Sequence, residues 1–287
     1  MSEKTDLKIL MLDKGPDIDK RKCPTSRGIG CVRCIPCSLL SGWGGAGAFS
    51  DGKLTLSSEV GGWLNEYLDG NELNGLIDYV DKVYLRFGAP EKLYGTDFDK
   101  VEEIERKATL AGLKLVREKL RHLGTEECAE ILKRVRRSLE RKVEIRTDSE
   151  VKSLLVEGGR VRGVVVGDGE IRAKYVVAAP GRVGAEWLAE EAKRLGLKTL
   201  SNPVDVGVRV EVSAPVMEEI TQILYEPKFV FFSKSFDDKV RIFCVCPGGE
   251  VITESYNDVI TVNGQSYAET KSGNTNFAIL VSTSFTE

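Results

Sequence analysis

Four cysteines stand close together near the start of the chain, directly before a run of glycines. Cys23, Cys31, Cys34 and Cys37 have the spacing C-x7-C-x2-C-x2-C. Two successive CxxC turns can bring three thiolates to one centre, and a fourth thiolate would complete a tetrahedral sulfur site. The spacing is compatible with zinc and with a [4Fe–4S] cluster and does not decide between them. Unligated thiols are the third interpretation of the same pattern.

The glycine run that follows, GWGGAG at 42–47, has the composition of a ligand-binding loop. Glycine lets the backbone approach a ligand closely and adopt positive φ angles. Successive backbone N–H groups in such a loop form a concavity that suits phosphate. Trp43 and Phe49 are apolar anchors, which indicate a packed loop rather than a flexible surface segment. We therefore expect a ligand to lie against this stretch.

Composition narrows the class of protein. The 287 residues suffice for two domains, and 41% hydrophobic residues support a sizeable core. A net charge of −3 with dispersed basic residues argues against nucleic acid. No apolar run approaches the roughly 20 residues that cross a bilayer, and no leader opens the chain, so we expect a cytoplasmic protein with reduced thiols. The scarcity of glutamine and histidine beside abundant Lys, Arg and Glu is typical of a thermophile.

The elements that must position these residues alternate between strands and helices in the first 200 residues. Leu7–Asp13 is predicted to be a buried strand that ends in an acid, and Lys174–Ala179 a second buried strand. A β-meander with Gly-Gly and Gly-Asp-Gly turns is expected over 150–172. Further short strands are expected at 114–117 and 143–146, and helices at 72–87, 98–111, 126–141 and 184–195.

From residue 202 onward strands dominate, so we expect a domain boundary near Ser201. The predicted organisation is a domain over 1–201, which includes the Cys/Gly-rich loop at 23–62, and a mostly β domain over 202–287. The predicted fold class is α/β (α+β overall); the family resemblance described next implies an incomplete Rossmann-like domain with a β-meander and an inserted, mostly β substrate domain.

Several strings in this order resemble one family. They are GWGGAGAFSDGKLTL at 42–56, FGAP at 87–90, HLGT at 122–125, CVCPGG at 244–249 and VNGQSY at 262–267. Together with the order of elements, they resemble the FAD-dependent dehydrogenase (oxidoreductase) family of the glutathione-reductase-type fold. The resemblance implies a flavoprotein that exchanges a hydride between FAD and a small-molecule substrate, whose identity the sequence does not reveal.

The resemblance also implies which residues meet the cofactor. Asp13 ends its strand where this fold places an acid on the adenosine ribose, and Lys14 follows it. Val151 and Gly181 match positions near the adenine and the nucleotide. The remaining candidates run beside the flavin and pyrophosphate: Gly44, Gly45, Ala46, Gly47, Ser50, Asp51 and Lys53.

Two segments that the resemblance leads one to expect do not occur in this sequence. The family opens with a strand and a GxGxxG turn that receives the FAD pyrophosphate on a helix N-terminus, and it ends with a Gly-Asp-Gly turn. We therefore expect a fragment of a flavoprotein, or half of one completed by a second chain, that alone binds FAD poorly. The alternative is a non-enzymatic product or a metal-binding subunit without FAD.

A few residues outside the loop are weaker candidates for catalysis. His122 is the only histidine, and we expect it in a turn before a helix. Cys244 and Cys246 are expected to alternate on a strand and so to face opposite sides, which argues against a redox pair. Cys246 stays a candidate through its motif. Asn263-Gly264 is predicted to be a turn.

Overall fold

A computed structural model of the protein describes residues 1–24, 31–256, 259–267 and 269–284. The chain divides into two units, which we call unit 1 (1–48, 132–200 and 254–261) and unit 2 (49–131, 201–253 and 262–287). These units group 49–131 with the C-terminal strands, and the expected domains 1–201 and 202–287 stay a prediction. Residues 25–30 of the Cys/Gly-rich loop lie outside the described residues.

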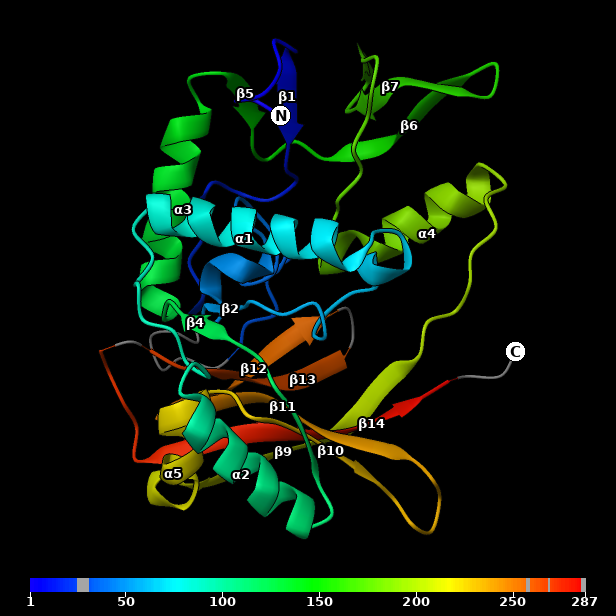
Figure 1. The fold of residues 1–287 in the computed structure, drawn as a ribbon. Helices are drawn as coiled ribbons and strands as arrows, with labels where there is room; N and C mark the ends of the chain where they lie inside the picture. The colour runs from blue at the N-terminus through cyan, green and yellow to red at the C-terminus, as the bar shows by residue number, and fades with distance from the viewer. Residues whose placement is uncertain (25–30, 257–258, 268, 285–287) are drawn as a thin grey trace. The chain divides into compact units, whose positions relative to one another are not determined.

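Unit 1 contains the expected N-terminal strand and the expected meander. β1 (Ile9–Leu12) pairs in parallel with β5 (Val143–Arg146), with Ile9 opposite Val143. The meander consists of the antiparallel strands β6 (Val151–Glu157), β7 (Arg160–Val166) and β8 (Gly169–Arg172), which confirms the prediction (Figure 1). Gly158 and Gly159 have φ angles of 56° and 73°, the left-handed conformation that a tight hairpin turn requires.

The segment 174–179 is not a strand, so this part of the prediction was wrong. Its backbone belongs to none of the described ladders, and Tyr175 and Val177 are 66% and 77% exposed. An apolar run forms a buried strand only when a neighbouring strand and a covering layer exist. Among the described residues, β1 pairs only with β5, and that small sheet does not include this segment.

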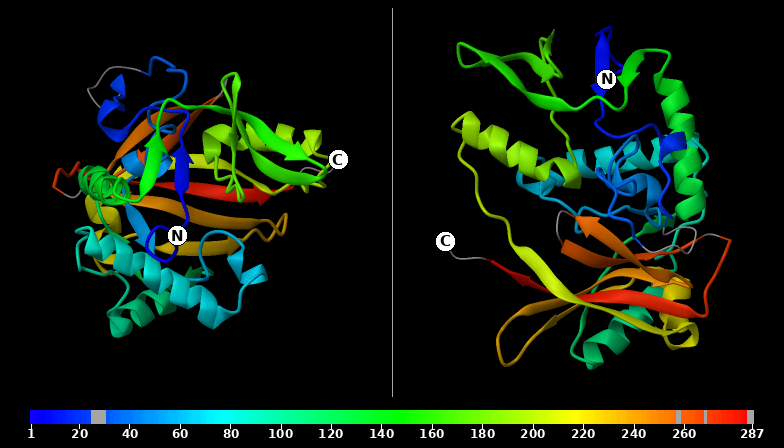
Figure 2. Two further views of the ribbon diagram at one scale, coloured as in Figure 1. Left: turned by 90° about the horizontal axis from the view of Figure 1, so that it is seen from above. Right: turned by 180° about the vertical axis from the view of Figure 1, so that it is seen from behind.

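The core of unit 2 is an antiparallel sheet covered by two helices. The strand order is β3 (Lys114–Val116), β10 (Lys228–Phe232), β11 (Lys239–Pro247), β14 (Asn274–Thr283) and β9 (Val204–Ser213). Helices α2 (Phe98–Leu110) and α5 (Ala214–Leu224) pack on it (Figure 2). The buried cluster between them consists of Val101, Ile104, Ala108, Leu115, Leu224 and Phe229.

The helices begin where the sequence supplies a cap. Asp69 accepts hydrogen bonds from two N–H groups in the first turn of α1 (Gly70–Arg86), and Asp97 caps α2 by accepting from the N–H of Lys100. Pro215 opens α5, which the sequence reasoning missed. The other two helices are α3 (Thr125–Leu139) and α4 (Ala185–Arg194), both close to their predicted ranges. None of the described helices is long and apolar enough to span a membrane.

Two further strand pairs complete the fold. β2 (Lys53–Thr55) pairs with β4 (Leu120–His122), and this register sets Lys53 opposite His122. β12 (Glu250–Tyr256) pairs with β13 (Val259–Gln265). Two predictions are corrected here. His122 ends a strand instead of lying in a turn, and Asn263-Gly264 lies within β13, because the strand continues through both residues.

Candidate functional site

In unit 1, one buried arginine organises the glycine-rich loop. Arg21 is 4% exposed, and its guanidinium donates hydrogen bonds to five carbonyl oxygens. The acceptors and distances are Ser38 (2.9 Å), Leu39 (2.9 Å), Gly42 (3.4 Å), Trp43 (2.7 Å) and Gly45 (2.8 Å). Burial lowers the pKa of Arg21 to about 10, so it stays charged at neutral pH. This fork of donors fixes the path of the loop.

Asp13 lies directly after β1, as predicted, and faces the same loop. Its Oδ1 accepts a hydrogen bond from the N–H of Gly15 at 2.8 Å. Burial raises the pKa of Asp13, while hydrogen bonds from the backbone of Gly15 and Gly42 and the charge of Arg21 oppose that rise. The adjacent Lys14 forms a partly exposed ion pair with Glu150 at 3.8 Å.

The loop leaves open space where a cofactor would need it. A methyl group added to Gly45 or Gly47 would meet no atom within 4 Å, whereas one added to Gly42 would clash with the Pro16 carbonyl oxygen. Gly45 has a φ of 59°, a conformation that disfavours other residues. Gly181, which precedes α4, combines a φ of 66° with the same open space. Backbone bordered by open space fits the close approach of a nucleotide, so these residues are compatible with FAD.

The predicted cofactor residues do not all lie in one unit. Unit 1 contains Asp13, Lys14, Gly44, Gly45, Ala46, Gly47, Val151 and Gly181. Val151 begins β6 and is half-buried. Ser50, Asp51 and Lys53 belong to unit 2, where Asp51 and Lys53 take part in the buried cluster described below. Their contact with FAD stays a prediction.

None of the four N-terminal cysteines forms a disulfide within the part of the chain that the structure describes. Cys31 is exposed, and Cys23, Cys34 and Cys37 are half-buried. Within the described residues, no three of these sulfurs lie within 4.8 Å of one another. An iron–sulfur cluster or zinc on this set therefore stays a prediction made from the spacing alone.

In unit 2, a buried lysine joins two carboxylates. Lys53 is only 6% exposed in its side chain, and its ammonium lies 2.7 Å from Asp51 Oδ2 and 3.4 Å from Glu226 Oε1. It also donates to the carbonyl oxygen of Val245 at 2.7 Å. Burial alone would lower the pKa of Lys53, but the charges of Asp51, Cys246 and Glu226 outweigh burial and raise it above its ordinary value. The ammonium is thus held charged inside the protein.

Cys244 and Cys246 lie together beside this lysine, which contradicts the prediction that they face opposite sides. Their sulfur atoms are 3.9 Å apart. The ladder between β11 and β14 is irregular between Phe243 and Cys246, and Cys244 has a φ of 50°. A bulge breaks the alternation of side chains along a strand, and here it turns both sulfurs toward Lys53, at 3.9 and 3.8 Å.

A second cation, Arg209 on β9, completes the surroundings of the two sulfurs. Its guanidinium lies 3.3 Å from the Cys246 sulfur and 3.6 Å from the Cys244 sulfur. Asn276 holds Arg209 in place by accepting from its Nε at 2.8 Å. A methyl group on Gly264 would lie 1.8 Å from the guanidinium, so the absence of a side chain at position 264 makes room for Arg209.

The histidine candidate lies nearby in a neutral hydrogen-bond network. His122 Nε2 lies 2.8 Å from the Tyr225 hydroxyl and 3.2 Å from the Ser266 hydroxyl. Burial, with the nearby charges of Lys271 and Lys53, lowers the pKa of His122 to about 3. The imidazole is therefore neutral at physiological pH, and its partner Ser266 is fully buried.

Sequence reasoning missed Arg21, Arg209 and Glu226. Arg21 stands between two lysines, Lys20 and Lys22, and looks like part of a solvated basic stretch. Arg209 alternates with valines on a strand, a pattern that predicts an outward charge. A usable signal existed only for Glu226, which precedes Pro227 in a segment whose other residues, apart from Lys228, are apolar or aromatic.

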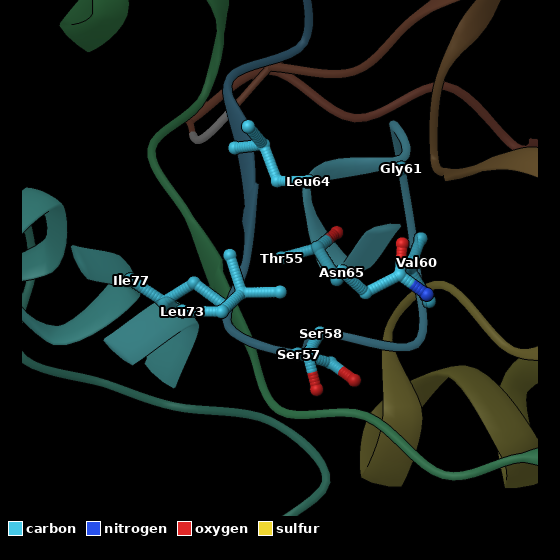
Figure 3. Close-up of a pocket in the computed structure, with 9 residues that line it drawn as sticks. All are labelled: Thr55, Ser57, Ser58, Val60, Gly61, Leu64, Asn65, Leu73 and Ile77. Atoms are coloured by element: carbon cyan, nitrogen blue, oxygen red, sulfur yellow. The ribbon is translucent and has the colours of Figure 1, made fainter. Parts of the chain in front are cut away.

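A small cavity of about 150 Å³ also occurs in unit 2, shown in Figure 3. It lies between the end of β2 and the start of α1, and Leu73 and Ile77 contribute its apolar wall. The hydroxyls of Thr55, Ser57 and Ser58 supply the polar side. Ligand pockets usually enclose about 300–1,000 Å³, so this cavity is too small to hold FAD.

Two solved structures show loose similarity to the chain. An L-amino acid deaminase from Proteus vulgaris has a TM-score of 0.33 and 13% identity over 80% of this chain and 60% of its own. A glycine oxidase from Bacillus cereus has a TM-score of 0.33 and 14% identity over 86% of this chain and 66% of its own.

Sequence comparisons are more specific. An uncharacterised protein of Clostridium beijerinckii is 25% identical over 292 residues, which cover 96% of this chain and 47% of that protein. The chain thus spans about half the length of this relative. A family described as an FAD binding domain matches residues 83–207, and one described as an FAD-dependent protein, C-terminal domain-like, matches 203–287. Both matched families are FAD-related, in agreement with the family resemblance that the sequence motifs predicted.

Proposed function

We propose that the chain forms part of an FAD-dependent oxidoreductase that acts on a small-molecule substrate. The observation that carries this proposal is the glycine-rich loop of unit 1. Arg21 holds its carbonyl groups, and Gly45 and Gly47 border open space. The two family matches together cover residues 83–287, and both concern FAD. The cysteines of the described residues form no disulfide, which supports a reducing compartment, and we infer this to be the cytoplasm.

In this proposal the loop and Asp13 hold the cofactor. Gly44, Gly45, Ala46 and Gly47 present main chain to the nucleotide, while Asp13 supplies a carboxylate for its hydroxyl groups. FAD, when bound, supplies the hydride chemistry, and the protein contributes orientation and electrostatics. The role of Arg21 is to keep the loop in one conformation, so that ordering it costs little when the nucleotide binds.

Two glycines of unit 1 allow a matched test. Gly45 and Gly158 have φ angles of 59° and 56°, and a methyl group at either would meet no atom within 4 Å. Gly45→Val and Gly158→Val therefore impose similar backbone strain, of the order of 1 kcal/mol or more. Only position 45 belongs to the proposed cofactor wall; position 158 lies in the β6–β7 turn.

The measurement is the flavin content of the protein produced at its natural length and purified under native conditions. Absorbance of the released flavin gives the number of FAD molecules per chain. The loss of flavin on dilution gives the relative affinity for FAD. We expect Gly45→Val to lose FAD at least tenfold more readily than the parent and Gly158→Val to behave like the parent. Equal retention of FAD by both variants would show that the loop is not the cofactor wall.

A further inference from the structure

The pair Cys244 and Cys246 has a geometry that neither the family match nor the cofactor site explains. The β11 bulge holds the two sulfurs 3.9 Å apart on one side of the strand. A disulfide has a sulfur–sulfur distance of about 2.05 Å, so modest side-chain rotations would join them. Two thiols at this distance beside two cations are prepared for oxidation. Structural cysteines in a core need neither the cations nor the bulge.

We propose that Cys244 and Cys246 form a thiol–disulfide exchange site, in which Cys244 attacks an external disulfide and Cys246 resolves the mixed disulfide. Burial sets this order. Cys244 is partly exposed, whereas Cys246 is fully buried. A small disulfide can therefore meet only the Cys244 sulfur first. The proposal concerns unit 2 alone and does not depend on FAD.

The charges around the two sulfurs distinguish their roles. Cys244 is surrounded by the Cys246 thiol, Lys53 and Arg209, with Asp51 opposing them. The hydrogen bond from Cys246 and the two cations lower the pKa of Cys244 to about 6, against the effect of burial. The hydrogen bond with Cys244 and burial raise the pKa of Cys246. Cys244 is thus the thiolate at neutral pH, and Cys246 keeps its proton.

The exchange balances with a small organic disulfide, RSSR, as oxidant. The Cys244 thiolate attacks one sulfur of RSSR, a mixed disulfide forms, and RS⁻ leaves. Cys246 then loses its proton and attacks the Cys244 sulfur, which closes the protein disulfide and releases the second RS⁻. Asp51 Oδ2 lies 3.3 Å from the Cys246 sulfur and is placed to take that proton. Two protein thiols are oxidised, and RSSR is reduced to two RSH.

The same three side chains could be taken for a metal site, because ligand atoms of Asp51, Cys244 and Cys246 lie within 4.8 Å of one another. The two cations argue against it. Lys53 already lies 2.7 Å from the Asp51 carboxylate, and Arg209 lies 3.3 Å from the Cys246 sulfur. A divalent ion would meet two positive charges at short range, whereas a thiolate is stabilised by both.

The first test follows oxidation directly. The reduced full chain is equilibrated with glutathione buffers of increasing oxidised fraction, quenched in acid, alkylated with N-ethylmaleimide and digested. Mass spectrometry should show the peptide that holds both cysteines losing two hydrogens, while Cys128 remains alkylated as a free thiol. Cys246→Ser should accumulate glutathione on Cys244, and Cys128→Ser should behave like the parent. A pair that stays reduced in excess oxidised glutathione overturns the proposal.

The second test needs no cysteine variant, so it does not depend on how well such variants fold. Iodoacetamide alkylation of the parent chain is followed peptide by peptide against pH. Cys244 should be half-maximally reactive near pH 6 and, at that pH, about tenfold faster than an ordinary thiol after allowing for its weaker nucleophilicity. Preferential reaction of Cys246, or stoichiometric binding of added Zn²⁺ that blocks alkylation of both, would also overturn the proposal.

Discussion

Arg21 in unit 1 and Lys53 in unit 2 are both buried cations, but their partners differ. In unit 1, Arg21 donates to five backbone carbonyl oxygens of the loop. In unit 2, Lys53 contacts the carboxylates of Asp51 and Glu226 and lies beside two sulfurs. Arginine has a planar fork of donors that suits several fixed acceptors, whereas lysine is a compact point charge.

This difference gives the two cations different roles, a structural one for Arg21 and a chemical one for Lys53. Neutral carbonyl acceptors do not titrate, so the contacts of Arg21 hold a conformation over a wide range of pH. Carboxylates and thiols do titrate, so Lys53 sets the protonation of the groups around it. A cation among titratable partners marks the place where proton and electron chemistry can occur, and this points to the cysteine pair.

The largest expected effect comes from removing each cation in turn. Lys53→Met removes the cation that lies closest to the buried Asp51 carboxylate and leaves Glu226 with Lys228 as its ion-pair partner, and we expect it to destabilise the protein by about 3–5 kcal/mol at pH 8. The loss should shrink at pH 5, because the carboxylates can then be neutralised by protonation. Arg21→Met leaves buried carbonyl groups without donors, which costs roughly 3 kcal/mol or more with a much weaker dependence on pH.

Urea unfolding of both variants and the parent at pH 5 and pH 8 measures this contrast. The informative quantity is how much the destabilisation caused by each substitution changes between pH 5 and pH 8. This change does not depend on the absolute cost of the substitution. If Arg21→Met showed the same pH dependence as Lys53→Met, the distinction between a conformational and an electrostatic cation would be lost.

The second prediction concerns Glu118, a buried carboxylate close to the Lys53 cluster. Lys228 lies 3.7 Å from it, but neither of its oxygens has a hydrogen-bond partner. Burial raises the pKa of Glu118 to about 7. A raised folded pKa means that its contribution to stability is fully present below about pH 4.5 and is lost as the pH rises through 7. Glu118→Gln should therefore stabilise the protein at pH 8 by about 2 kcal/mol more than at pH 5.

Thermal unfolding of the parent and Glu118→Gln across that pH range tests the sign. A matched control is Glu102→Gln, which changes an exposed carboxylate of α2. A stabilisation by Glu118→Gln that did not grow with pH would mean that the Lys228 ion pair keeps Glu118 ionised. Glu118 would then not be one of the groups near Lys53 that change their protonation over this pH range.

Much of the fold was predictable because it follows local rules. The helices α1 and α2 begin after Asp69 and Asp97, and the meander turns at paired glycines. The segment 174–179 was predicted wrongly because its apolar pattern says nothing about whether a partner strand lies beside it. Helix α5 was missed because its apolar residues resemble those of the strands around it.

The candidate site was less predictable, because it depends on an irregularity. Strict alternation of side chains along β11 would have placed Cys244 and Cys246 on opposite faces. Neither residue of the pair predicts the bulge that prevents this. The family resemblance assigned Asp51 and Lys53 to FAD from their place in one motif. The contacts of Lys53 in unit 2 include Glu226 and Val245, which follow it by 173 and 192 residues in the sequence.

The smallest expected effect tests whether the second cation, Arg209, contributes to the chemistry of unit 2. Gly264→Ala places a methyl group against the guanidinium and Asn276, so it should displace Arg209 without altering a cysteine. Losing one nearby cation should raise the pKa of Cys244 by roughly one unit, equivalent to about 1.4 kcal/mol. The pH profile of Cys244 alkylation measures this shift. Gly273→Ala is the matched control, because a methyl group there would meet no atom within 4 Å. An unshifted profile in Gly264→Ala would leave Lys53 as the cation that matters and would sharpen its contrast with Arg21.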